Sequence, residues 1–124
     1  MHNVQSPNNT DAGIEQLIQA KGKTAARVTP ADIEANIRAE TYFTAFDGFM
    51  ADDRDMTMKD ADALKLLTFC VLVLRNGFTV TGESACASPE NFDAEIGRKI
   101  ARQNAVQKIW PLMGYKLKCD LNQK

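Results

Sequence analysis

Histidine is nearly absent from this 124-residue chain: the single one, His2, lies in a polar, asparagine-rich N-terminal segment. General acid–base catalysis most often uses histidine, and serine and cysteine nucleophiles are commonly activated by one. The chain also lacks the loops G-x-x-x-x-G-K-[ST] and G-x-G-x-x-G, in which glycines let the backbone approach nucleotide phosphates. We therefore expect no enzymatic activity.

An excess of basic residues is missing too. The chain has 15 basic and 16 acidic residues, for a formal net charge of −1. Proteins that bind nucleic acids generally carry a basic surplus, because they neutralise several backbone phosphates. The charge balance therefore argues against a nucleic-acid partner.

Paired cysteines are lacking as well. Cys70, Cys86 and Cys119 are odd in number and form no C-x-x-C pair, so neither a disulfide framework nor a zinc site is expected. Unpaired thiols are typical of a reducing cytoplasm. The N-terminus lacks the basic-then-apolar order of a signal peptide, and the longest apolar run, 66–74, is too short to cross a membrane. We expect no metal and no cofactor.

That apolar run predicts the centre of the fold. A strand covered on both faces has such a composition, as does a buried helix. The pair Asn76-Gly77 follows it, and this pair favours a two-residue hairpin turn in which both residues have positive φ. Apolar residues and threonines alternate after the turn. The sequence therefore predicts an antiparallel hairpin over residues 66–84.

A long amphipathic helix is predicted over about 89–110. Ser88 can cap it, Pro89 fits the first turn, and Glu90 complements the positive end of the helix dipole. An apolar stripe at helical spacing is expected to pack on the sheet. The stripe consists of Phe92, Ile96, Ile100, Gln103, Val106 and Trp110. Pro111 either ends or kinks the helix.

The other elements are shorter. Helical spacing and a Thr-Pro-Ala-Asp start signal predict helices over 13–21 and 30–38. Aromatic and β-branched residues predict a strand near 41–46, and alternation predicts a last strand from Tyr115 to Leu121. The acidic segment 47–62 is expected to be a surface loop, with one helical turn at most.

Together these elements predict one α+β domain spanning residues 1–124, with residues 1–12 disordered. In this domain a small antiparallel sheet packs against the long helix, and short helices precede the sheet.

A polar stripe lies beside the apolar one on the long helix and contains Asn91, Glu95, Arg98 and Arg102. The planar guanidinium groups suit phosphate oxygens, and asparagine can hydrogen-bond a base or a ribose. Spacing alone equally allows an ordinary surface pair of Glu95 with Arg98. The stripe continues into Ala105 and Ile109, which hints at packing between subunits.

Other charged residues have two interpretations each. The carboxylates Glu83, Glu90, Asp93 and Glu95 could hold a hard cation, but acids near a helix start ordinarily complement its dipole. Arg27 precedes the second helix, where it could point into a site or simply lie exposed in a loop.

Two segments of the second half are distinctive: TGESAC at 81–86 and PENFD-x-EIGR at 89–98. Residues 76–115, which contain both, closely resemble a family of small phage and prophage proteins. The family is named from gene products of coliphage N-four and Shigella phage Sf-six. The resemblance extends upstream to AARVTP at 25–30, whereas the 47–62 loop and Met113 diverge.

The family is also similar to the Thoeris anti-defence proteins of phages, which sequester a cyclic ADP-ribose-type signal made by host TIR-domain enzymes. The resemblance implies a homo-oligomeric phage protein of the host cytoplasm that binds such a cyclic nucleotide without altering it. Guanidinium groups would hold phosphates, a ring would stack on the base, and Asn or Asp would bind ribose. The site residues so implied are Arg27, Phe78, Asn91, Asp93, Arg98 and Arg102.

Two alternatives remain open at the level of sequence. The first is a small oligomeric phage protein that binds a host protein or DNA through the same helix face. The second is a metal-dependent nucleotide hydrolase that uses Glu83 and Asp93.

Overall fold

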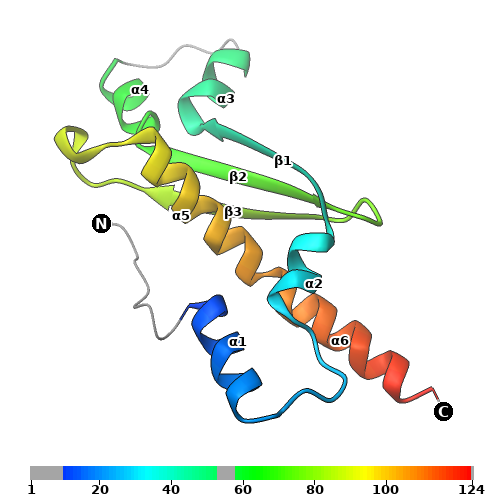
Figure 1. Cartoon of the computed structure of the whole chain (residues 1–124). Helices are drawn as coiled ribbons and strands as arrows, with labels where there is room; N and C mark the ends of the chain where they lie inside the picture. Colours follow the sequence, from blue (N-terminus) through cyan, green and yellow to red (C-terminus); the bar gives the residue numbers. More distant parts are fainter. Residues whose placement is uncertain (1–9, 53–57, 124) are drawn as a thin grey trace.

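The α+β class is confirmed in the computed structural model, which describes residues 10–52 and 58–123 (Figure 1). Residues 1–9 of the segment predicted to be disordered lie outside the described residues, but Asp11 and Ala12 already belong to the first helix. The elements are, in order, α1 (Asp11–Ala20), α2 (Pro30–Ala35), β1 (Ile37–Thr44), α3 (Ala45–Asp52), α4 (Met58–Leu64), β2 (Leu67–Leu74), β3 (Thr79–Ala85), the 3-10 turn η2 (Pro89–Asn91), α5 (Ala94–Gln107) and α6 (Ile109–Leu121).

The sheet is antiparallel, with the strand order β1-β2-β3. Its hairpin is confirmed, but the turn is one residue longer than predicted. The Leu74 N–H donates to the Phe78 carbonyl at 2.8 Å, and the Gly77 N–H donates to the Leu74 carbonyl at 2.9 Å. Three residues therefore lie in the loop, and Gly77, at φ 91°, occupies the left-handed position that closes such loops.

Helix α5 covers one face of the sheet, and the core lies between them. Cys70, Leu72 and Leu74 of β2 point into this core together with Val80 of β3. A Cβ atom built on Gly82 would lie 2.2 Å from the Ala101 carbonyl oxygen, so the helix backbone rests directly on this glycine. The TGESAC segment thus includes a point where the backbones of β3 and α5 approach closely.

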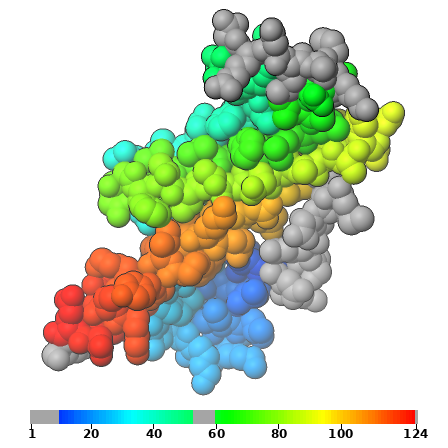
Figure 2. Space-filling model, turned by 180° about the vertical axis from the view of Figure 1, so that it is seen from behind, coloured from blue at the N-terminus to red at the C-terminus, as the bar shows by residue number. Residues whose placement is uncertain are grey.

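No helix within the described residues lies along the opposite face of the sheet (Figure 2). The outward side chains of β2 are Leu67, Phe69, Val71 and Val73, all half-buried. Antiparallel sheets with one solvated face normally alternate apolar and polar residues. The central strand does not follow that rule, because its outward residues are apolar too.

The long helix begins later than predicted, and its predicted buried stripe is confirmed only at Ile100 and Val106. Asp93 caps α5 by accepting from the Ile96 N–H at 3.1 Å, whereas the Ser88 side chain makes no capping bond. The face that meets the sheet includes the small residues Gly97, Ala101 and Ala105, so that helix and strand approach closely. The buried residues of α5 are Gly97, Ile100, Ala101, Ala105 and Val106, and Ile96 is 44% exposed.

The predicted subunit contact at Ala105 and Ile109 is wrong, because both residues are fully buried in the core of one chain. The predicted C-terminal strand is also wrong. Residues 109–121 form α6, and Pro111 lies in its first turn, where its missing N–H breaks no intrahelical bond. A single turn residue, Lys108, separates α5 from α6.

The segment 47–62 is more helical than predicted within its described residues, because α3 and α4 occupy most of them. Thr44 and Asp47 explain the start of α3. The Asp47 N–H donates to the Thr44 hydroxyl at 3.2 Å, and the Thr44 N–H donates to the Asp47 carboxylate at 2.8 Å. None of the helices within residues 10–52 and 58–123 combines the length and apolar character needed to cross a bilayer.

Candidate functional site

Arg102 ties α5 to α2 and β1. Its guanidinium donates to both oxygens of Glu34, at 2.8 and 3.1 Å, and to Glu40 at 2.9 Å. Glu40 also accepts from the Tyr42 hydroxyl at 2.5 Å. Arg102 therefore has two carboxylate partners within the chain, and Tyr42 is held to the same cluster.

The pKa values in this cluster reflect these bonds. The hydrogen bonds from Arg102 lower the pKa of Glu34, and those from Tyr42 and Arg102 lower the pKa of Glu40. Desolvation and the bond to Glu40 raise the pKa of Tyr42. Both carboxylates stay ionised at neutral pH, and the tyrosine keeps its proton as a donor.

Arg98 lies one turn before Arg102 and is not neutralised. It forms no ion pair with any residue in the described ranges, and its guanidinium carbon lies 6.0 Å from the centre of the Tyr42 ring. A hollow of about 60 Å³ opens beside it, where β1 ends and α5 begins. The hollow is lined by Tyr42, Phe43, Thr44, Asp47, Thr68, Phe92, Ala94 and Arg98.

This arrangement can hold an anion next to aromatic surface. A guanidinium without a carboxylate partner is available for a phosphate, and the rings of Tyr42 and Phe92 border the same hollow. Ligand pockets commonly measure about 300–1,000 Å³. The hollow in one chain can therefore take a phosphate or part of a ring, and the rest of a dinucleotide would extend over the surface.

The structure separates the six site residues implied by the resemblance. Asn91 is exposed in η2, and Asp93 serves as the cap of α5, so both lie at the Arg98 end of the sheet. Phe78, 55% exposed, lies beside the hairpin turn at the opposite end. Arg98 lines the hollow, and Arg102 is held in its carboxylate cluster.

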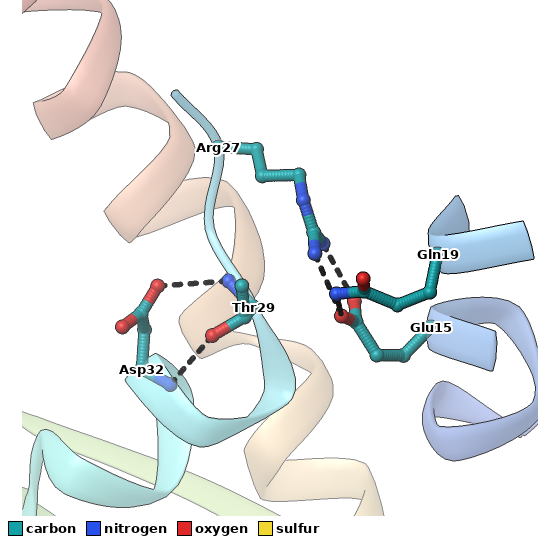
Figure 3. A network of polar contacts seen from close by, with 5 residues as sticks. All are labelled: Glu15, Gln19, Arg27, Thr29 and Asp32. Carbon is teal, nitrogen blue, oxygen red and sulfur yellow. Dashed lines mark hydrogen bonds and ion pairs between the residues drawn. The ribbon is translucent and has the colours of Figure 1, made fainter. Parts of the chain in front are cut away.

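Arg27 has a partner of its own on α1 (Figure 3). Its guanidinium donates to both oxygens of Glu15, at 2.6 and 2.7 Å, and Gln19 also donates to this carboxylate, at 2.9 Å. These bonds lower the pKa of Glu15 to about 2. Arg27 therefore fastens α1 rather than reaching the Arg98 hollow.

The carboxylates considered for a cation also have local roles. Glu90 accepts from the Ser88 hydroxyl at 2.6 Å, and Glu95 pairs with Lys99 at 3.3 Å. Across the described ranges, no three histidine, cysteine or acidic side chains gather in a group that could hold a metal ion.

Helix α1 lies over a second cavity, of about 200 Å³, lined by Asp11, Ile14, Glu15, Ile18, Val28, Pro30, Gln107 and Trp110. The Trp110 indole N–H donates to Asp11 at 3.1 Å. Since Trp110 is the sole tryptophan, its fluorescence reports whether α1 is docked.

We predict that acid releases α1 through Glu15. The ion pair with Arg27 contributes fully above the unfolded-state pKa of Glu15, near 4.5, and is lost as pH falls toward about 2. Glu15→Gln is expected to make Trp110 more accessible to acrylamide at pH 7, and to remove the pH-dependent change between pH 4.5 and 2. Glu95→Gln, which alters an exposed pair on α5, serves as the control. Equal quenching in Glu15→Gln and the native protein would contradict this role.

The three aromatic residues of the hollow, Tyr42, Phe43 and Phe92, are not among the site residues expected from the sequence. Tyr42 reaches Arg98 because β1 pairs with β2 and α5 packs on β2 and β3, an arrangement that depends on contacts distant in sequence. The helical spacing predicts that Phe92 belongs to the buried stripe, but it lines the hollow and is only half-buried. The aromatic and β-branched residues of 41–46 predict a strand that contains Tyr42, but they do not indicate which residue Tyr42 contacts.

Comparison with known proteins adds one result. No curated protein and no solved structure matches the chain significantly. Residues 28–121 match the family described as phage protein (N4 Gp49/phage Sf6 gene 66). The match includes the sheet, α5 and α6, and it leaves out α1 and Arg27. Because it spans most of the chain, the protein belongs to this phage protein family.

Proposed function

We propose that this phage protein is an anti-defence protein that binds a cyclic ADP-ribose-like signal of the host and holds it without altering it. The observation that carries the proposal is Arg98, a guanidinium without an ion-pair partner in the described ranges, beside the Tyr42 ring and the hollow. A phosphate of the ligand would bind the Arg98 guanidinium, and the base of the ligand would lie near the ring of Tyr42 or Phe92.

The Arg102 cluster supports this by fixing the ring. Tyr42 donates to Glu40, and Glu40 accepts from Arg102. The ring is thus oriented before any ligand arrives, which lowers the entropic cost of binding. Because the Tyr42 pKa is raised, its hydroxyl acts as a donor and is unsuited to be a general base near pH 7. Binding without turnover is consistent with both features.

A thermal-shift screen tests the proposal. Cyclic ADP-ribose and its isomers are added to the purified protein, with AMP and ADP-ribose as controls. At a free concentration 100 times Kd, a ligand stabilises the folded state by about 2.7 kcal/mol, which raises Tm by about 10 °C. Mass spectrometry of the ligand released by denaturation is expected to show it intact.

The alternatives give different results. A hydrolase would release cleaved nucleotide in a chelator-sensitive reaction. A DNA-binding protein would show no shift with cyclic nucleotides, and its affinity for duplex DNA would fall steeply with salt. Absence of any shift across the cyclic nucleotides would contradict the proposal.

A further inference from the structure

The cavity of about 200 Å³ under α1, here called the α1 cleft, has the size and charge for a ligand unlike a nucleotide. It lies where α1 passes beside the junction of α5 and α6 (Figure 1). We propose that the α1 cleft binds a small organic ammonium ion, an amine joined to one aromatic ring through a short alkyl chain. This inference does not depend on the proposed function, because the α1 cleft and the Arg98 hollow share no lining residue.

Helix α1 does not fill the space beneath it. None of its residues is buried, and Ile14 is 46% exposed although it lines the cleft. Protein interiors normally contain few voids larger than a water molecule, and an apolar cavity of about 150 Å³ is enough to hold benzene. The α1 cleft therefore has room for one aromatic ring.

The walls of the cleft suit the apolar part of such a ligand. They come from α1, from the chain that enters α2 and from α6, and their apolar residues are Ile14, Ile18, Val28, Pro30 and Trp110. A ring placed among these side chains would bury apolar surface. Among aromatic side chains, the indole of tryptophan attracts organic cations most strongly.

One carboxylate of the cleft is left for a cation. Glu15 is neutralised by Arg27, whose guanidinium holds both of its oxygens (Figure 3). Within the described residues, Asp11 has neutral donors instead: the Trp110 indole N–H at 3.1 Å and the Gln107 side-chain amide at 3.3 Å. A carboxylate has about four lone-pair sites, so Asp11 can also accept from an ammonium group.

The same charges disfavour a nucleotide in the α1 cleft. Arg27 is occupied by Glu15, and the carboxylate of Asp11 would repel a phosphate. The family match begins at residue 28, so the α1 wall of the cleft lies outside the matched residues. We therefore expect an ammonium ligand to distinguish this chain from family members that lack an equivalent of α1.

Fluorescence titration of the sole tryptophan tests the proposal on the native protein. Three probes of similar shape and different charge are compared: phenethylamine, phenethyl alcohol and phenylacetate. Phenethylamine is expected to change the Trp110 emission saturably and to bind at least about tenfold more tightly than the alcohol. Phenylacetate is expected not to bind. A lack of saturable change with the amine, or binding of the alcohol or the acid as tightly as the amine, would overturn the proposal.

A variant tests the role of Asp11. Asp11→Asn removes the charge but keeps an oxygen that can accept from Trp110, so α1 is expected to stay docked, as acrylamide quenching of the free variant would verify. Its affinity for phenethylamine is expected to fall at least about tenfold, to the level for the alcohol. Glu95→Gln, on the surface of α5, is expected to bind the amine like the native protein.

Unchanged amine affinity in Asp11→Asn would refute the assignment. If quenching shows that α1 has detached in this variant, the charge preference of the native protein among the three probes decides.

Discussion

Replacing Gly82 with alanine is expected to destabilise the fold by at least about 3 kcal/mol, the upper end for overpacking a core. The new methyl carbon would lie 2.2 Å from the Ala101 carbonyl oxygen and 2.3 Å from the Ala105 nitrogen. Both atoms belong to the α5 backbone, so no side-chain rotation can relieve the clash. The helix must move off the sheet, and the contacts of its buried stripe weaken.

Urea denaturation measures this effect through the midpoint and the slope. Gly114→Ala is the matched control, because a Cβ at this position in α6 meets no atom within 4 Å. It is expected to be neutral, or to stabilise α6 by up to about 1 kcal/mol through helix propensity. Similar stability of the two variants would mean that α5 does not rest on Gly82.

Leu72→Ala is expected to cost about 3–5 kcal/mol, the range for removing a buried leucine side chain. Leu72 is fully buried between β2 and α5. Its neighbour Val73 points to the open face and is only half-buried. Val73→Ala is therefore expected to cost about 1 kcal/mol or less in the monomer.

Chemical denaturation of Leu72→Ala and Val73→Ala at low protein concentration separates folding from any association between chains. A larger loss for Val73→Ala than for Leu72→Ala would contradict the assignment of the two faces of β2.

Local signals in the sequence predicted much of the fold correctly. Thr29 and Asp32 form the expected capping box, with bonds of 3.1 and 2.9 Å (Figure 3), because such a box depends only on residues three apart. The apolar run 66–74 and the following Asn76-Gly77 likewise predicted the hairpin. The length of the turn could not be predicted, since the same pair also fits a three-residue loop that ends in a left-handed glycine.

Longer-range features escaped prediction. Residues 115–121 alternate like a strand, yet their apolar residues also recur at helical spacing, and no strand edge was assigned to receive them. The face of α5 that meets the sheet contains Gly97, Ala101 and Ala105. These small residues let the helix backbone approach the sheet closely, but they bury little apolar surface, so an apolar stripe does not reveal them.

The candidate site was only partly predictable for the same reason. Arg98 and Arg102 occupy neighbouring turns of one helix, so helical spacing predicts the same phosphate-binding role for both. Glu34 and Glu40, 68 and 62 residues before Arg102 in the chain, neutralise Arg102 alone. Pairings over such distances depend on how α2 and β1 are placed by the folded core.

The most direct test of the account is a calorimetric titration of the native protein, Arg98→Ala and Lys99→Ala with the cyclic nucleotide that gives the largest thermal shift. Hydrogen bonds to a charged group contribute about 1.5–3 kcal/mol, so Arg98→Ala is expected to weaken binding by roughly 10- to 150-fold. Lys99, adjacent in sequence and paired with Glu95 on the surface, is expected to leave Kd within about twofold, since surface pairs contribute little. Equal affinities of the native protein and Arg98→Ala would contradict the assignment of the site.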